Sequence, residues 1–83
     1  MSDNDVMVRL TSVFRNVFGN DTLSVSRGTT AEDVHGWDSL MHINLITAIE
    51  GAFTVRFTTR EIIALRNVGD LVDLVARKQS VSP

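Results

Sequence analysis

The sequence contains no cysteine and no tyrosine, and it has only one proline and one tryptophan. Without cysteine no disulfide can stabilise the chain, which fits a reducing compartment. No apolar run approaches the length of a membrane span or of the hydrophobic region of a signal peptide, and the first residues, MSDND, are acidic. We therefore expect a soluble, cytoplasmic protein that has no membrane partner.

A surplus of basic residues is also missing. The 8 Lys and Arg are outnumbered by 10 Asp and Glu, which gives a formal net charge of −2. A general nucleic-acid binder would carry a basic excess, so this class is excluded. At 83 residues, 43% of them apolar, the chain is too short for two lobes and too hydrophobic to be disordered. We expect one domain over residues 1–83, with flexible ends at about 1–4 and 79–83.

The first predicted helix covers residues 6–18, because its apolar residues fall at helical spacing and Gly19 supplies a stop. Ser2 or Asp3 would cap its start. Residues 19–37 contain three Gly and many Ser, Thr and Asp, which predicts a long loop. A loop of this length in a small domain is itself an indication of function.

Three further helices are predicted. Asp38 offers a side-chain oxygen to cap a helix over residues 39–53. A Thr and a Glu at capping-box spacing begin a short helix at residues 58–65, and an Asn and an Asp at the same spacing begin a last helix at Asn67. Only the segment FTVRF alternates like a strand, and it is short. The predicted fold is all-α, a small four-helix bundle of three main helices and a short third helix, with a long loop between helices 1 and 2.

The second predicted helix has apolar residues on two sides. Projection at about 100° per residue places His42 at the centre of an arc that should be buried, formed by Leu45, Ile46, Ile49 and Phe53. The opposite side carries Leu40, Ile43, Asn44 and Thr47. Exposed apolar residues beside a helix start indicate a surface for partners. The alternative is that the long loop covers Leu40 or Ile43.

Ser39 stands in the first turn of this helix, and from spacing alone a serine there is most often only part of the cap. The whole string GWDSLMHINLITAIEGAF, however, resembles the modification site of acyl carrier proteins. Asp38, Ser39 and Leu40 match the D-S-L motif of that family, whose serine receives 4′-phosphopantetheine. The closing pattern of the helix matches at Ala48, Ile49, Glu50 and Phe53. Because FTTREI and NVGDLVDLV also resemble the family's third and fourth helices, the resemblance covers essentially the entire chain.

This resemblance implies a carrier and not an enzyme. Ser39 would bear 4′-phosphopantetheine, which a separate phosphopantetheinyl transferase adds from coenzyme A with magnesium, and Asp38 would help that transferase recognise its target. The thiol of the arm would carry acyl groups as thioesters between the acyl-transferring, ligating or condensing enzymes of a fatty-acid, polyketide or other specialised pathway. We expect a monomer with no catalytic residue, no metal site and no nucleic-acid partner. At a helix N-terminus, Ser39 would also present a phosphodiester to free backbone N–H groups, which favour an anion.

Partner-binding residues are expected on the exposed side of the second helix and are Leu40, Met41, Ile43, Asn44, Thr47 and Glu50. Many carriers line this side with acids, but here Glu50 is the only acid between Ser39 and Phe57. We therefore expect recognition to depend more on the apolar residues than on long-range charge. A basic flank near the third helix consists of Arg56, Arg60 and Arg66, and we interpret it as ordinary solvated surface.

Two aromatic residues near the motif bear on the kind of carrier. Trp37 favours a stand-alone carrier, because peptidyl carriers of nonribosomal pathways more often have a second Gly or a His near this position; a peptidyl carrier is the alternative. Trp37 is also interpreted as an anchor for the end of the loop, and both interpretations can hold. His42 is expected as a satisfied histidine at the core or its edge, or else at the mouth of a cavity that holds an acyl chain.

Two unrelated functions compete with the carrier interpretation. Asp38, Ser39, His35 and His42 lie close in sequence, as in a hydrolase, but the G-x-S-x-G elbow is missing and 83 residues leave no substrate cleft. The C-terminal third could form a helix-turn-helix DNA-binding module. Its last helix carries Asp70 and Asp73, and the net charge is −2, both of which argue against DNA binding.

Overall fold

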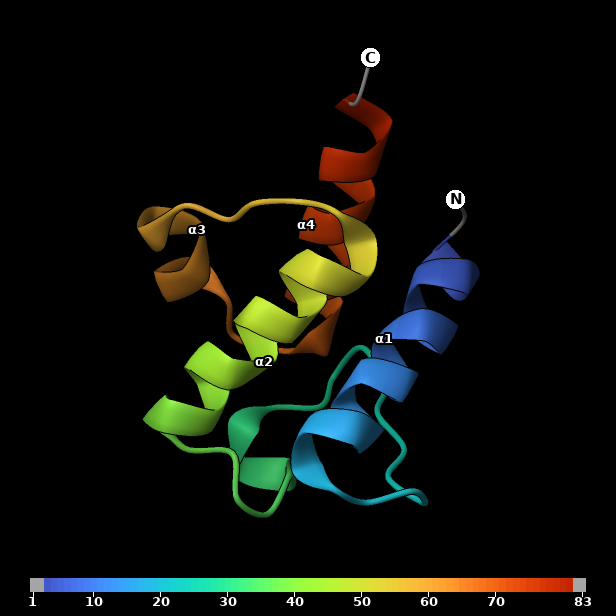
Figure 1. The fold of residues 1–83 in the computed structure, drawn as a ribbon, viewed down its shortest axis with the longest axis vertical. Helices are drawn as coiled ribbons and strands as arrows, with labels where there is room; N and C mark the ends of the chain where they lie inside the picture. Colours follow the sequence, from blue (N-terminus) through green and yellow to red (C-terminus); the bar gives the residue numbers. More distant parts are fainter. Residues whose placement is uncertain (1–2, 82–83) are drawn as a thin grey trace.

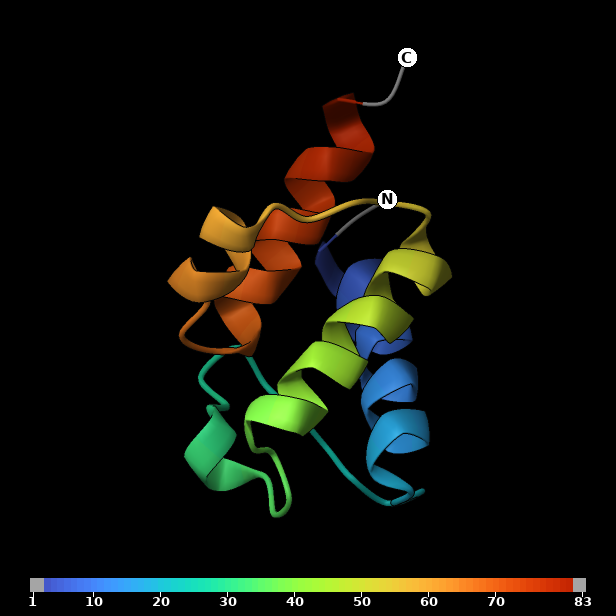
Figure 2. The ribbon, with the colours of Figure 1, turned by 60° about the vertical axis from the view of Figure 1, so that its left-hand side comes forward.

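The computed structural model describes residues 3–81, which form the helices α1 (Asp3–Phe18), α2 (Ser39–Phe53), α3 (Thr59–Ala64) and α4 (Val68–Val81) and a short 3₁₀ helix, η1 (Ala31–Asp33). Helix α3 lies on the side of α2 that is away from α1, and the long connection from α1 to α2 crosses the lower end of the molecule (Figures 1 and 2). No strand forms among the described residues, so FTVRF is not a strand. The prediction of an all-α fold with a short third helix and a long loop is confirmed.

The limits of the first helix differ from the prediction. Helix α1 begins at Asp3, so Asp3 is helical and does not cap it, while Ser2 lies outside the described residues. At the other end, Gly19 adopts a φ of 63°, a left-handed conformation that favours glycine and ends the helix as expected. The predicted flexible ends fall partly on residues 1–2 and 82–83, which are also outside the described residues; residues 3–4 and 79–81 belong to α1 and α4.

The core is formed by apolar side chains from α1, α2 and α4. On α2 the buried residues are Leu45, Ile46, Ile49 and Phe53, the four residues predicted from the helical projection. They pack with Val6, Leu10 and Phe14 of α1 and with Val68, Leu71, Val72 and Val75 of α4. Full burial of one such side chain contributes roughly 1.5–3 kcal/mol. This packing fixes α2, and therefore its N-terminus, relative to the rest of the chain.

Helix α3 is held by a capping box and an ion pair. The Thr58 hydroxyl accepts a hydrogen bond from the Glu61 backbone N–H (3.2 Å), and a Glu61 carboxylate oxygen accepts one from the Thr58 N–H (2.8 Å), as the sequence predicts. The same carboxylate lies 2.9 Å from Nζ of Lys78 on α4. The Thr58 backbone N–H, and after it Lys78, lower the pKa of Glu61 below its ordinary value. Glu61 therefore joins the start of α3 to the end of α4.

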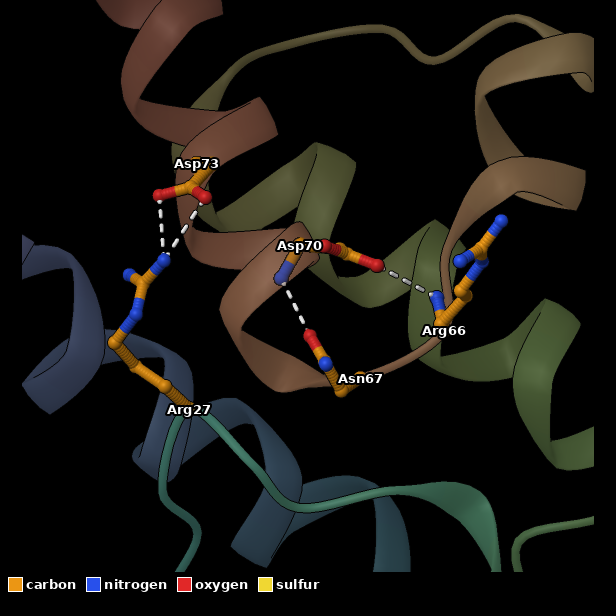
Figure 3. A network of polar contacts seen from close by, with 5 residues as sticks. All are labelled: Arg27, Arg66, Asn67, Asp70 and Asp73. Atoms are coloured by element: carbon orange, nitrogen blue, oxygen red, sulfur yellow. Dashed lines mark hydrogen bonds and ion pairs between the residues drawn. The ribbon is translucent and has the colours of Figure 1, made fainter.

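The start of α4 is fixed by a local polar network (Figure 3). The Asn67 side-chain oxygen accepts a hydrogen bond from the Asp70 N–H (2.8 Å), which confirms the predicted cap. In the expected box Asp70 would bind the Asn67 N–H in return, but its carboxylate accepts from the Arg66 N–H instead (3.0 Å). The return hydrogen bond of the cap therefore comes from the residue before Asn67 and not from Asn67 itself.

The long loop is bound to α4 through its backbone. The N–H groups of Val68 and Gly69 donate to the carbonyls of Thr29 (2.9 Å) and Arg27 (2.8 Å). Gly69 allows this close approach, because a Cβ at this position would lie 3.0 Å from the Arg27 carbonyl oxygen, closer than is usual for a Cβ. The Arg27 side chain also forms two 2.9 Å contacts with the carboxylate of Asp73 (Figure 3). The loop is therefore anchored midway and leads in a defined direction to the start of α2.

Helix α2 ends at Phe53, as the sequence predicts, but the backbone of the next residue is unexpected. Thr54 has a φ of 56° and a ψ of 51°, a left-handed conformation that is uncommon for a β-branched residue. Its N–H donates to the Glu50 carbonyl, which closes the last turn. Among the described residues no helix is long and apolar enough to cross a lipid bilayer.

Candidate functional site

Asp38 caps α2 as predicted. Its backbone is extended, with a φ of −109° and a ψ of −172°, and its Oδ1 accepts a hydrogen bond from the Met41 N–H at 2.9 Å. Its carbonyl accepts the first helical hydrogen bond, from the His42 N–H at 2.8 Å. The carboxylate is therefore directed back onto its own helix, where it satisfies an otherwise free donor.

Ser39 is the first residue of α2 and is exposed to solvent. Within residues 3–81 its hydroxyl forms no hydrogen bond, because the capping function belongs to Asp38. Ser39 is not bonded to His35 or His42, and Asp38 binds a backbone amide and no histidine. A hydrolytic triad is therefore not assembled here, and the serine oxygen is presented as a free acceptor or nucleophile for an external reagent.

Trp37 anchors the end of the loop immediately before the motif. Its ring meets Phe14 edge-on, with 5.3 Å between ring centroids, and stacks on His42 at 6.0 Å. Gly36 supplies the turn that brings it there, at a φ of 90°. These contacts fix the chain on the N-terminal side of Ser39, as helix α2 does on the other side.

His42 is half-buried and its ring is held by Trp37. Trp37 Nε1–H donates to His42 Nδ1 at 3.1 Å, which makes Nδ1 an acceptor and assigns the proton of the neutral ring to Nε2. His42 is thus the satisfied edge histidine that was expected. It also lines the cleft beside Ser39.

An open cleft of about 540 Å³ adjoins Ser39. Its walls are mainly apolar and include Trp37, Ile43, Leu65 and Leu71, while Arg66 and Asn67 add polar groups. The sequence assigned none of Leu65, Arg66 and Leu71 to the site. Only the folded chain places the start of α4 beside the start of α2, so that residues of both line one cleft.

Four of the six residues predicted to contact partners are exposed on α2. Leu40 is 71% exposed and Ile43 is 55% exposed, so the loop covers neither of them. Asn44 and Thr47 are also exposed, whereas Met41 is half-buried. Glu50 is half-buried as well, and its carboxylate accepts a hydrogen bond from the Phe57 N–H at 2.9 Å, so it holds the connection between α2 and α3. No cluster of three or more His, Cys, Asp or Glu side chains that could hold a metal ion occurs in the described part of the chain.

Comparison with known proteins gives three consistent results. The family model described as "Phosphopantetheine attachment site" matches residues 8–75. An acyl carrier protein of Acidothermus cellulolyticus is 30% identical over 76 residues, which cover 92% of this chain and 90% of that protein. The solution structure of a holo acyl carrier protein from Geobacter metallireducens is 42% identical and has a TM-score of 0.87, over 92% of this chain and 87% of that one.

Proposed function

Because this chain belongs to the phosphopantetheine attachment-site family of acyl carrier proteins, we propose that Ser39 is the residue to which its 4′-phosphopantetheine group is attached. Proteins of this family are non-catalytic carriers that bear 4′-phosphopantetheine and interact with a phosphopantetheinyl transferase and with the enzymes of a pathway. The proposal therefore concerns which atoms of this chain perform that role and how.

The single observation that supports Ser39 is its free hydroxyl in the D-S-L motif at the start of α2. The residue is exposed, and its oxygen is not needed for the helix cap, since Asp38 Oδ1 accepts from the Met41 N–H. Thr58, at the start of α3, shows the contrast: its hydroxyl is occupied by the Glu61 N–H. Attachment to Ser39 would cost no hydrogen bond of the folded chain.

In the proposed modification the Ser39 oxygen attacks the phosphorus of coenzyme A that bears the pantetheine moiety. A new P–O bond forms, the bond within the diphosphate breaks, adenosine 3′,5′-bisphosphate leaves, and the serine proton passes to a base on the transferase. The chain supplies only the correctly placed hydroxyl. Its rigid position between the Trp37 anchor and helix α2 favours a single geometry for the transferase to bind.

The attached group would supply the thiol that this cysteine-free chain lacks, and that thiol forms thioesters with acyl groups. The arm is also a tether, which raises the effective concentration of the acyl group at the active site of a docked enzyme. The apolar cleft beside Ser39 is large enough to accommodate part of such an arm or its cargo. Asp38 would serve in recognition by the transferase, and its capping bond keeps its carboxylate turned toward the helix.

For the finer assignment we propose a monomeric, cytoplasmic, stand-alone carrier of a fatty-acid, polyketide or other specialised pathway. The apolar residues Leu40 and Ile43 and the neighbouring Met41, Asn44 and Thr47 would contact its partner enzymes. Glu50 would contribute less than the other predicted contacts, because its carboxylate is bonded to the Phe57 N–H.

Intact-mass spectrometry tests the attachment site. Incubation of the chain with a broad-specificity transferase, magnesium and coenzyme A should add one phosphopantetheine group, and Ser39→Ala should remain unmodified. Ser12→Ala, at an exposed serine on α1, is the matched control and should be modified fully. Wild-type chain that stays unmodified while a known carrier is converted in the same tube, or modification that persists in Ser39→Ala, would refute the proposal.

A further inference from the structure

Three cationic side chains of this protein have no partner within residues 3–81. They are Arg56, Arg60 and Arg66; all three are exposed and lie between the end of α2 and the start of α4. The other five cationic side chains each have an interaction. Arg9 and Arg15 donate to the carbonyls of Ala52 and Leu23. Arg27 pairs with Asp73, Lys78 pairs with Glu61, and Arg77 also has an interaction. Free positive charge is therefore concentrated around α3.

The acids of the same region are all occupied. Glu61 binds the Thr58 N–H and Lys78, Asp70 binds the Arg66 N–H, and Asp73 is paired with Arg27. In Figure 3 the Arg66 side chain extends away from Asp73, and only its backbone N–H meets Asp70. The guanidinium groups thus remain available, whereas the nearby carboxylates are committed to the fold.

Two of these arginines are continuous with the Ser39 site. Arg60 and Arg66 line a second groove, of about 610 Å³, and Arg66 also lines the cleft that contains Ser39 and Ile43. Ile63 stands three residues after Arg60, on the same side of α3, and is 77% exposed. We call Arg60, Ile63 and Arg66 the basic edge. Arg66 and Ile43 line the same cleft, which connects the basic edge to the exposed aliphatic residues Leu40 and Ile43 of α2.

We propose that the basic edge and the exposed aliphatic residues of α2 form a docking surface for a partner enzyme that presents acidic side chains around an apolar pocket. The inference rests on the proposed carrier function and adds the chemistry of the partner. Apolar side chains would enter the pocket, and the arginines would pair with the acidic rim, which steers association and fixes the orientation of the carrier. Arginine suits such a rim because its planar group can bind a carboxylate with two hydrogen bonds.

Complementary charge favours a protein partner over a lipid surface or a nucleic acid. The chain as a whole has a net charge of −2, so an anionic bilayer or a phosphate backbone would repel it apart from this one edge. A protein surface of limited size can match the edge without meeting the rest of the molecule. From α2 alone we expected recognition to depend mainly on apolar residues. The basic edge adds a contribution from charge, in which the carrier is positive and its partner is negative.

A peptide titration tests the proposed complementarity. Two synthetic helical peptides of equal length, each with leucine on one face and with either glutamate or lysine on the other, are added to the full ¹⁵N-labelled chain loaded with phosphopantetheine. The glutamate peptide should shift the amide resonances of residues 60–66 and 40–43 and should bind more weakly as salt is added. Arg60→Gln/Arg66→Gln should weaken this binding by about tenfold at low salt.

The control variant changes the net charge equally at a distant place. Ser12→Glu/Ser24→Glu also lowers the net charge by two, at exposed positions on α1 and the long loop, and it should bind the glutamate peptide nearly as the wild type does. Equal binding of both peptides, or equal losses in the two double variants, would overturn the inference. So would salt-sensitive binding to phosphatidylglycerol vesicles that exceeds binding to the glutamate peptide.

Mass spectrometry of the same samples separates this inference from the proposed function. The wild-type chain and Ser12→Glu/Ser24→Glu should both be modified at Ser39, because these two exposed serines belong neither to the cap nor to the cleft beside it. Absence of modification in the wild-type chain would refute the carrier role itself. Complete modification without charge-selective binding would refute the docking surface alone.

Discussion

Asp38→Ala should destabilise the protein, because it removes the only side-chain cap of α2. The Met41 N–H, now 2.9 Å from Asp38 Oδ1, would lose its acceptor. Loss of such a cap costs about 1 kcal/mol, and loss of a negative charge at a helix N-terminus adds about 0.3–1 kcal/mol. For a domain of this size we expect the melting temperature to fall by roughly 4–8 °C for each kcal/mol lost.

Asp38→Asn is the informative comparison. Asparagine caps nearly as well as aspartate, so this variant should lose only the charge contribution and should unfold between the wild type and Asp38→Ala. Thr58→Ala, which removes the cap of the short helix α3, is a control for the loss of a cap away from the site. Thermal unfolding followed by circular dichroism, with urea unfolding at 25 °C, gives all four free energies.

The same variants separate folding from recognition. If the transferase reads the carboxylate of Asp38, Asp38→Asn should be modified more slowly than the wild type while remaining folded. Thr58→Ala should be modified at the rate of the wild type. The reasoning is refuted if Asp38→Ala is as stable as the wild type, or if Asn and Ala at this position are equally destabilising, since either result would mean that the observed cap contributes nothing.

Two further predictions concern the support of the site. Because the pKa of Glu61 is lowered on folding, its contribution to stability is complete above the ordinary glutamate pKa and is lost as the pH falls through the folded value. Urea unfolding from neutral pH to about pH 3 should therefore show a shallower acid dependence for Glu61→Gln, and an unchanged slope would contradict this assignment. Gly69→Ala should lower the free energy of unfolding by about 1–2 kcal/mol, because its Cβ would lie 3.0 Å from the Arg27 carbonyl oxygen. Gly51→Ala, where nothing lies within 4 Å, should instead raise that free energy by up to about 1 kcal/mol, and similar effects in the two variants would rule out the steric explanation.

The local parts of the fold were predictable from the sequence. Asp38 and Thr58 act as caps because an N-cap depends on a side chain and an amide two or three residues away, a relation that spacing alone reveals. Burial of Leu45 and Ile49 follows from helical periodicity for the same reason. The end of α2 at Phe53 was also predicted, but the left-handed backbone of Thr54 after it was not, since nothing in the residue type of threonine favours that conformation.

The non-local parts of the site required the folded chain. The cleft beside Ser39 is lined by residues of the long loop, of α2 and of the start of α4. The hydrogen bond from the Val68 N–H to the Thr29 carbonyl joins that loop to α4, although the two segments are far apart in sequence. No pattern of residue types marks such a backbone contact. The sequence also does not reveal that Arg60 and Arg66 lack ion-pair partners, because this depends on which groups the neighbouring carboxylates bind in the folded chain.

Because Asp38 caps α2, the Ser39 hydroxyl has no part in holding the helix. If the serine hydroxyl itself capped the helix, modification of that hydroxyl would remove the capping hydrogen bond and would change the stability of the fold. In this protein the Ser39 hydroxyl is exposed and is not part of the cap. A group attached to Ser39, as proposed above, would therefore change no hydrogen bond of the fold when it is added, altered or removed.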